Sequence, residues 1–212
     1  MEESFPWTDA EVTEVQEGKA IQEGNSLQVI KPEWEMHNRG LESQVPIVTL
    51  AWYEVAMGAF VGTTRRIEAL KRKLPDCNLK SDNNRWTDHL EGAAGEISVA
   101  KHLEIYWSGS VNTFRMGGDV GDYEVRSSGK HREMPIRERD KDEHYYVKAF
   151  GSSPNFRILG YIKCADAKNP DWWGDMGNGG PPCWWVPPEY LHPISELKEM
   201  IWGRCSHCGK TK

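Results

Sequence analysis

Apolar residues recur at intervals of three and four from Ile47 to Leu74, which is the spacing of one face of an α-helix. The segment ends in the basic turn LKRKLP, where cations favour a helix C-terminus and Pro75 stops the helix. Its most apolar part, residues 48–62, is shorter than the roughly 20 residues of a membrane span. We therefore predict a core helix. Its periodic apolar positions are Leu50, Trp52, Val55, Ala59, Phe60, Ile67 and Leu70.

A second helix is predicted from Thr87 to Trp107, with Thr87 or Asp88 as its N-cap and a Gly-Ala-Ala-Gly run for close packing. Small and apolar residues lie three residues before Glu96 and four and seven residues after it, so Glu96 shares their stripe and not the solvent face. An unpaired carboxylate is costly to bury. A metal ion on a neighbouring sheet is one way to satisfy it.

Beyond the second helix the apolar period changes to two, in short β-branched or aromatic runs divided by glycine, serine and proline. A Trp/Pro/Gly-rich segment follows, and then a short helix around residues 194–202. This order predicts an α/β fold with a mixed central β-sheet flanked by helices. The predicted strands are residues 111–118, 122–128, 144–151 and 156–164.

The 212 residues suit one domain, which we divide into three parts. Residues 1–45 form an acidic, irregular arm with ten acidic and three basic residues, interrupted by proline and glycine. Residues 46–170 form the α/β core. Residues 171–212 hold the Trp/Pro-rich segment, the short helix and a Cys-x-x-Cys tail. The chain carries a formal charge of −6, but without the arm it is about neutral, so charge neither requires nor excludes nucleic acid.

The first residues lack the basic and apolar regions of a signal peptide, so we expect a cytoplasmic protein with no membrane partner and reduced thiols. In the tail, Cys205 and Cys208 are half of a zinc ribbon. A structural Zn²⁺ there would need further ligands from Cys77, Cys164, Cys183, a histidine or another chain.

The stretch GGDVGDYEVRSS, residues 117–128, concentrates charge between glycines and serines. On a strand, Glu124 and Arg126 face the same side, and the glycines allow the backbone to turn so that Asp119 approaches Glu124. Two neighbouring carboxylates repel unless a cation lies between them, and Mg²⁺ is bound by such oxygens. With a guanidinium beside it, this arrangement suits phosphoryl-transfer chemistry. The simpler alternative is that Glu124 and Arg126 form surface ion pairs.

The run GAAGEISVAKHL, residues 92–103, followed by GGDVGDYEVRSS, resembles the PD-(D/E)XK nuclease superfamily. The resemblance implies a restriction-endonuclease-like fold and DNA cleavage with Mg²⁺ or Mn²⁺. It implies that Glu96 is the helical acid, that Asp119 and Glu124 are metal ligands joined by Glu96, and that Arg126 takes the lysine position. The strands also resemble uncharacterised nuclease-like proteins of bacteriophages, which would place the chain in the cytoplasm of a host cell.

The sequence departs from the family pattern in two respects. The spacing from Asp119 to Glu124 is short, which leaves Asp122 as an alternative ligand. Arg126 replaces the usual lysine, and because arginine stays protonated it can clamp a phosphate but cannot act as a general base.

We therefore expect a metal-dependent deoxyribonuclease that acts on DNA, with Glu96, Asp119, Glu124 and Arg126 as its catalytic residues. The alternatives are a catalytically inactive nuclease-fold protein that binds DNA or protein, and an acidic inhibitor or adaptor whose arm mimics nucleic acid. The sequence is also compatible with a homodimer. Basic residues from Arg126 to Lys148 and tryptophans from Trp172 to Trp185 could contact nucleic acid, but we favour a solvated loop for the basic residues and core or lid packing for the tryptophans.

Overall fold

The computed structural model describes residues 45–73, 82–111, 117–175 and 181–203, with side chains left out at 82–84. The acidic arm up to residue 44, the Cys205 and Cys208 pair and most of the predicted strand 111–118 lie outside these ranges. The chain from Val45 onward forms one compact unit. Its helices and strands are β1 (Ile47–Thr49), α2 (Trp52–Lys71), α3 (Asp82–Leu103), β2 (Tyr123–Ser128), β3 (Met134–Ile136), β4 (Tyr145–Ser152), β5 (Asn155–Lys163), α4 (Cys164–Ala167), β6 (Trp173–Gly174), β7 (Cys183–Val186) and α5 (Ile194–Trp202).

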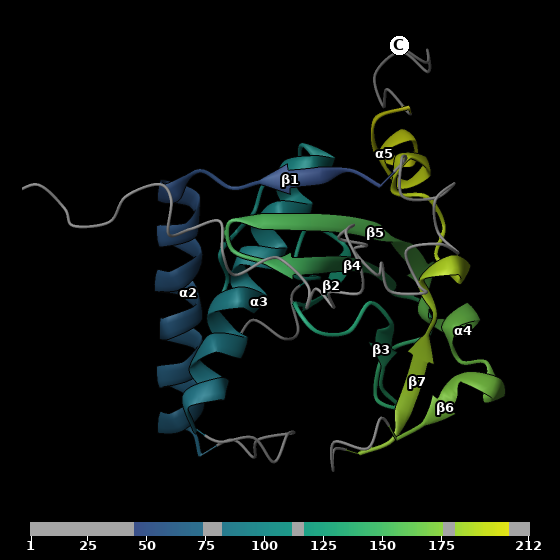
Figure 1. The fold of residues 1–212 in the computed structure, drawn as a ribbon, viewed down its shortest axis with the longest axis horizontal. Helices are drawn as coiled ribbons and strands as arrows, with labels where there is room; N and C mark the ends of the chain where they lie inside the picture. Colours follow the sequence, from purple (N-terminus) through teal and green to yellow (C-terminus); the bar gives the residue numbers. More distant parts are fainter. Residues whose placement is uncertain (1–44, 74–81, 112–116, 176–180, 204–212) are drawn as a thin grey trace, which may run out of the picture. The chain divides into compact units, whose positions relative to one another are not determined.

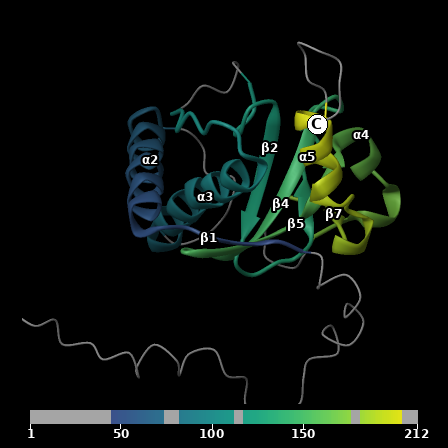
Figure 2. The ribbon, with the colours of Figure 1, turned by 90° about the horizontal axis from the view of Figure 1, so that it is seen from above.

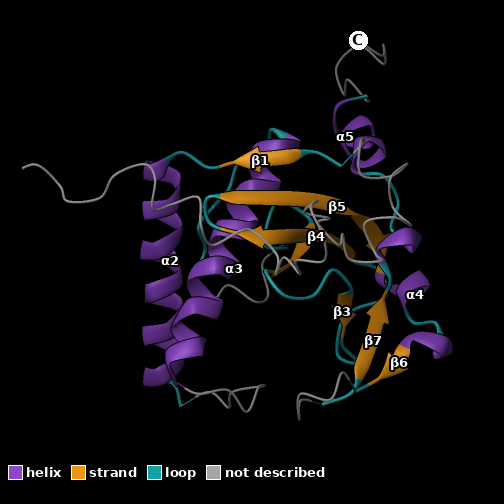
Figure 3. Ribbon diagram, viewed as in Figure 1, coloured by secondary structure: helices purple, strands orange, loops and turns teal. Residues whose placement is uncertain are grey.

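The predicted mixed α/β fold is confirmed: a mixed central sheet is flanked by helices (Figures 1 and 3). The strand order is β1-β5-β4-β2. Strand β2 lies at the edge and pairs in parallel with β4, so that Glu124 is opposite Tyr146 and Arg126 is opposite Lys148. The other pairs in this sheet are antiparallel. The three predicted strands that fall on described residues match β2, β4 and β5 to within one residue.

One face of the central sheet is covered by α3, and α2 lies outside α3 (Figure 2). Val125 and Val147 point from the sheet into this core, where they meet the alanine-rich side of α3. Gly95 makes the close approach possible, because a Cβ at this position would lie 2.4 Å from the Ser127 Cβ. The second helix ends at Leu103, earlier than predicted, because Glu104 adopts a left-handed φ of 58°.

A second sheet with the order β3-β7-β6 supplies a smaller apolar cluster, which includes Tyr146 and Ile162 from the central sheet. The Trp/Pro-rich segment contributes β6 and β7 to it. Its tryptophans pack on one another and on their neighbours: the rings of Trp173 and Trp184 are 4.5 Å apart, edge to face. Cys164 and Cys183 are buried free thiols.

The helix predicted over residues 47–74 is in fact a strand followed by a shorter helix. The β-branched residues of Ile47–Thr49 pair with β5 instead of continuing the helix. The helix starts at Trp52, after a turn in which the Ala51 N–H donates to Glu54 Oε2 at 2.7 Å. None of the helices in the described ranges combines the length and apolar character that a membrane crossing requires.

The side of α2 that packs on α3 also differs from the prediction. Helix α2 buries its small residues Gly58 and Gly62 against α3. A Cβ at Gly62 would lie 2.5 Å from the His89 carbonyl oxygen, so the two backbones are in close contact. Trp52 and Phe60, which we expected in the core, are 76% and 74% exposed.

Candidate functional site

The charged stretch forms a tight turn at the start of β2. Val120 and Tyr123 exchange backbone hydrogen bonds of 3.0 and 3.1 Å across Gly121, whose φ of 59° favours glycine. Gly118 lies against the returning strand, since a Cβ there would come within 2.5 Å of the Tyr123 carbonyl oxygen. This turn reverses the chain and brings Asp119, the residue after Gly118, back alongside β2.

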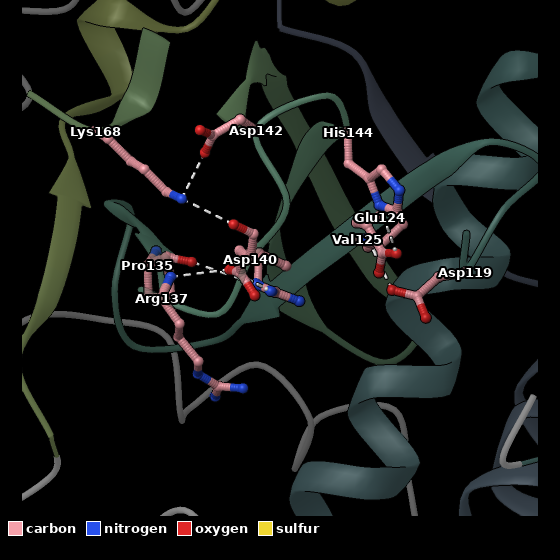
Figure 4. Close-up of polar contacts among 10 residues, drawn as sticks. Asp119, Glu124, Val125, Pro135, Arg137, Asp140, Asp142, His144 and Lys168 are labelled. Carbon is pink, nitrogen blue, oxygen red and sulfur yellow. Dashed lines mark hydrogen bonds and ion pairs between the residues drawn. The ribbon is translucent and has the colours of Figure 1, made fainter. Parts of the chain in front are cut away.

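Asp119 is the residue that the turn carries to β2. The Val125 N–H donates to Asp119 Oδ2 at 2.9 Å, and Figure 4 shows the Asp119 carboxylate close to the Glu124 side chain. Burial, and then the charge of Asp119, raise the pKa of Glu124. Asp122, the alternative ligand, is exposed at the turn. The structure therefore brings Asp119 and Glu124 together, as the glycine pattern indicates.

His144 lies directly before β4 and faces the same site. Its Nδ1 is 3.4 Å from Glu124 Oε1 (Figure 4). The sequence favours a structural or exposed role for a lone histidine such as His144, and its contact with Glu124 depends on the parallel register that places Tyr145 beside Tyr123. An imidazole at this position can accept or donate a proton next to the carboxylate.

Both carboxylate oxygens of Glu96, the acid expected to join the Asp119–Glu124 pair, accept hydrogen bonds from protein donors. Arg65 from α2 binds it in a bidentate manner, with Nη1 to Oε1 at 2.5 Å and Nη2 to Oε2 at 2.9 Å. The Trp107 indole N–H donates to Oε2 at 3.0 Å. Burial raises the pKa of Glu96, these hydrogen bonds oppose the shift, and the charge of Asp119 adds to it. The partner that we expected Glu96 to need is thus an arginine.

Arg126 is also engaged within the protein. Its Nη2 is 2.8 Å from Asp140 Oδ2, its Nε donates to the Pro135 carbonyl oxygen at 3.3 Å, and its guanidinium lies 4.7 Å from the centre of the Tyr146 ring. The Arg137 N–H shares Asp140, as Figure 4 shows. The side chain is 18% exposed. In this arrangement Nε and Nη2 of Arg126 anchor the loop after β3.

Lys148 lies beside Arg126 on β4 and is fully buried. Within the described part of the chain its Nζ has no hydrogen-bond partner. Burial lowers its pKa to about 8; the charge of Glu133 opposes this shift and that of Arg126 adds to it. Of the basic residues between Arg126 and Lys148, Lys148 is therefore inside the protein, and Arg126 is half-buried and paired with Asp140.

The described residues hold no group of three or more His, Cys, Asp and Glu side chains arranged for a metal ion. Two carboxylates are nevertheless a normal protein contribution to a Mg²⁺ site, where waters and substrate oxygens complete the shell. Asp119 and Glu124 fit this requirement electrostatically. The nearby guanidiniums of Arg65 and Arg126 are each paired with their own acid, and the charge of Arg126 opposes part of the rise in the pKa of Glu124.

Comparisons of the chain with protein-family models, with curated proteins and with solved structures find no match. The PD-(D/E)XK resemblance therefore stays a prediction, and functional inference depends on the geometry of the site itself.

Proposed function

We propose that this protein is a metal-dependent nuclease that hydrolyses phosphodiester bonds in DNA at the Asp119–Glu124 pair. The observation that carries the proposal is the convergence of these two carboxylates at an edge strand, where burial and then the charge of Asp119 raise the pKa of Glu124. A site that holds two like charges together costs stability, and such an arrangement is more common at functional sites than at structural ones.

Asp119 and Glu124 are the residues that would hold Mg²⁺ or Mn²⁺. Such an ion supplies an activated water and polarises a phosphate oxygen. The hydrogen bond from Val125 fixes one oxygen of Asp119, which leaves Oδ1 directed to other partners. His144 lies within reach of Glu124 and can take up a proton, which is the role that Arg126 cannot fill. Glu96 and Arg65 act as a structural pair beneath the site.

A second candidate function is a nuclease-fold protein that binds DNA or protein without cutting. The specific observation in its favour is the engagement of Arg126 by Asp140 and Pro135, because the cation at the family's lysine position is then neutralised within the protein. Both functions use the same turn and strand. They differ in turnover.

Cleavage of supercoiled, linear, single-stranded and branched DNA with Mg²⁺ or Mn²⁺ distinguishes the two. The native protein is expected to cut at least one substrate, and Glu124→Gln is expected to cut about 10²-fold more slowly or worse, as when a charge-stabilising group is removed from an active site. The matched control is Glu143→Gln. Glu143 is exposed in the loop just before His144, so this variant loses a nearby charge without touching the pair.

Equal activity in the native protein and Glu124→Gln would mean that a contaminant cuts the DNA or that the site is elsewhere. DNA binding by a native protein that cuts none of the substrates with either metal would favour the second candidate function.

A further inference from the structure

The outward face of α2 is apolar over most of its length. From Trp52 to Leu70, every exposed residue of α2 is apolar, and the first exposed charge is Lys71 in the last turn. The face follows helical spacing of three and four, apart from one gap at the less exposed Thr63 and Thr64. We call it the α2 stripe: Trp52, Tyr53, Ala56, Met57, Phe60, Ile67 and Leu70.

The opposite side of α2 is already used, because Gly58 and Gly62 hold the helix against α3. The side chains of the α2 stripe therefore do not pack in the described core. Its three aromatic side chains alone offer roughly 300–500 Å², since a fully covered aromatic residue buries about 150–250 Å² and these three are 68–76% exposed. With the aliphatic members the stripe is on the order of 600 Å², at the upper limit for a patch on a monomer and approaching the roughly 800 Å² per partner of a stable interface.

We propose that the α2 stripe is the interface of a homodimer, in which α2 packs antiparallel on α2 of a second copy. A helical stripe of about 30 Å matches another helix of the same length and spacing. A two-fold axis near the middle of the helix makes the contact self-complementary and closed.

The distribution of side-chain size along α2 favours the antiparallel arrangement. The N-terminal half carries the bulky Trp52, Tyr53 and Phe60, whereas the C-terminal half of the face carries threonines with Ile67 and Leu70. Antiparallel packing places the large half of each helix on the smaller half of the other. Parallel packing would set the largest residues against each other.

Charge favours the same orientation. In an antiparallel pair the basic last turns, which begin at Lys71, lie at opposite ends of the interface, and the helix dipoles are opposed. In a parallel pair the two basic ends would lie together and repel.

The test is the molar mass of the full chain, measured by light scattering with size-exclusion chromatography over a range of concentrations. The native protein is expected to have twice the 24.2 kDa mass of one chain. Met57→Glu is expected to be a monomer. The matched control is Met200→Glu on α5, because the two methionines are 53% and 48% exposed on helices and only Met57 belongs to the stripe.

A complementary pair of variants separates a lost interface from a lost fold. Phe60→Glu and Phe60→Lys, close to the proposed axis, are each expected to be monomers, and mixing them is expected to restore a dimer through opposite charges. A native protein that is monomeric at all concentrations would overturn the proposal. A Met57→Glu variant that stays dimeric, or mixed Phe60 variants that stay monomeric, would overturn it as well.

Discussion

Glu96→Ala is expected to lower the free energy of unfolding by about 3–5 kcal/mol, which is the typical cost of leaving one member of a buried ion pair alone. Arg65→Met is expected to lower the free energy of unfolding by less. The two members differ in how they respond to loss of the partner: arginine stays charged in proteins, whereas Glu96, whose pKa is already raised by burial, can neutralise itself by binding a proton. Glu96→Ala also leaves the Trp107 indole N–H without its acceptor.

Urea unfolding at neutral pH measures the free energy of unfolding of the two single variants and of the double variant Arg65→Met/Glu96→Met. The double variant is expected to be more stable than Glu96→Ala, because no buried charge is left alone. Equal losses for the two single variants would contradict the asymmetry. A stability loss below about 1 kcal/mol for Glu96→Ala, the level of a surface pair, would contradict the view that the pair is structural.

Lys148→Met is expected to stabilise the protein at pH 7 by up to about 3 kcal/mol. Burial lowers the pKa of Lys148 from 10.5 to about 8, and each unit of pKa difference between the folded and unfolded states is worth about 1.4 kcal/mol. Because the pKa is lower in the folded state, the native chain must protonate a buried amine below pH 8, and this cost disappears as the pH rises towards 10.5. Methionine has a similar length and no charge.

The sign of this effect is tested by following both proteins from pH 7 to 10.5. The stability advantage of Lys148→Met is expected to be constant below pH 8 and to shrink towards zero at pH 10.5. The control is Lys130→Met, at an exposed lysine, which is expected to change stability by about 0.5 kcal/mol or less. A destabilised Lys148→Met at pH 7 would show that the amine has a stabilising partner.

Strands β2, β4 and β5 of the central sheet were predictable because alternation of apolar and polar residues is a local property, whereas the three residues of β1 were predicted as helix. Val125 and Val147 both point into the core as their period of two requires. The face of α2 was not predictable from periodicity. Bulky apolar residues normally mark the core side, but here Gly62 allows α3 to approach and Phe60 is left outside.

In the candidate site, the approach of Asp119 to Glu124 followed from short-range features, namely glycines that permit a tight turn and a strand that follows directly. The partners of the other charges did not. His144 reaches Glu124 through the parallel register of β2 and β4, and Asp140 reaches Arg126 from a loop fourteen residues later. Arg65 reaches Glu96 from another helix, so only tertiary structure identifies it.

The most direct test of the central claim is the binding of Mn²⁺ to the full chain, followed by titration with electron paramagnetic resonance in the absence of DNA. The native protein is expected to bind the ion, Asp119→Asn is expected to lose that binding, and Asp122→Asn, at the exposed aspartate of the same turn, is expected to keep it. If Asp119→Asn binds Mn²⁺ as well as the native protein does, or if the native protein binds none, Asp119 and Glu124 do not form a metal site.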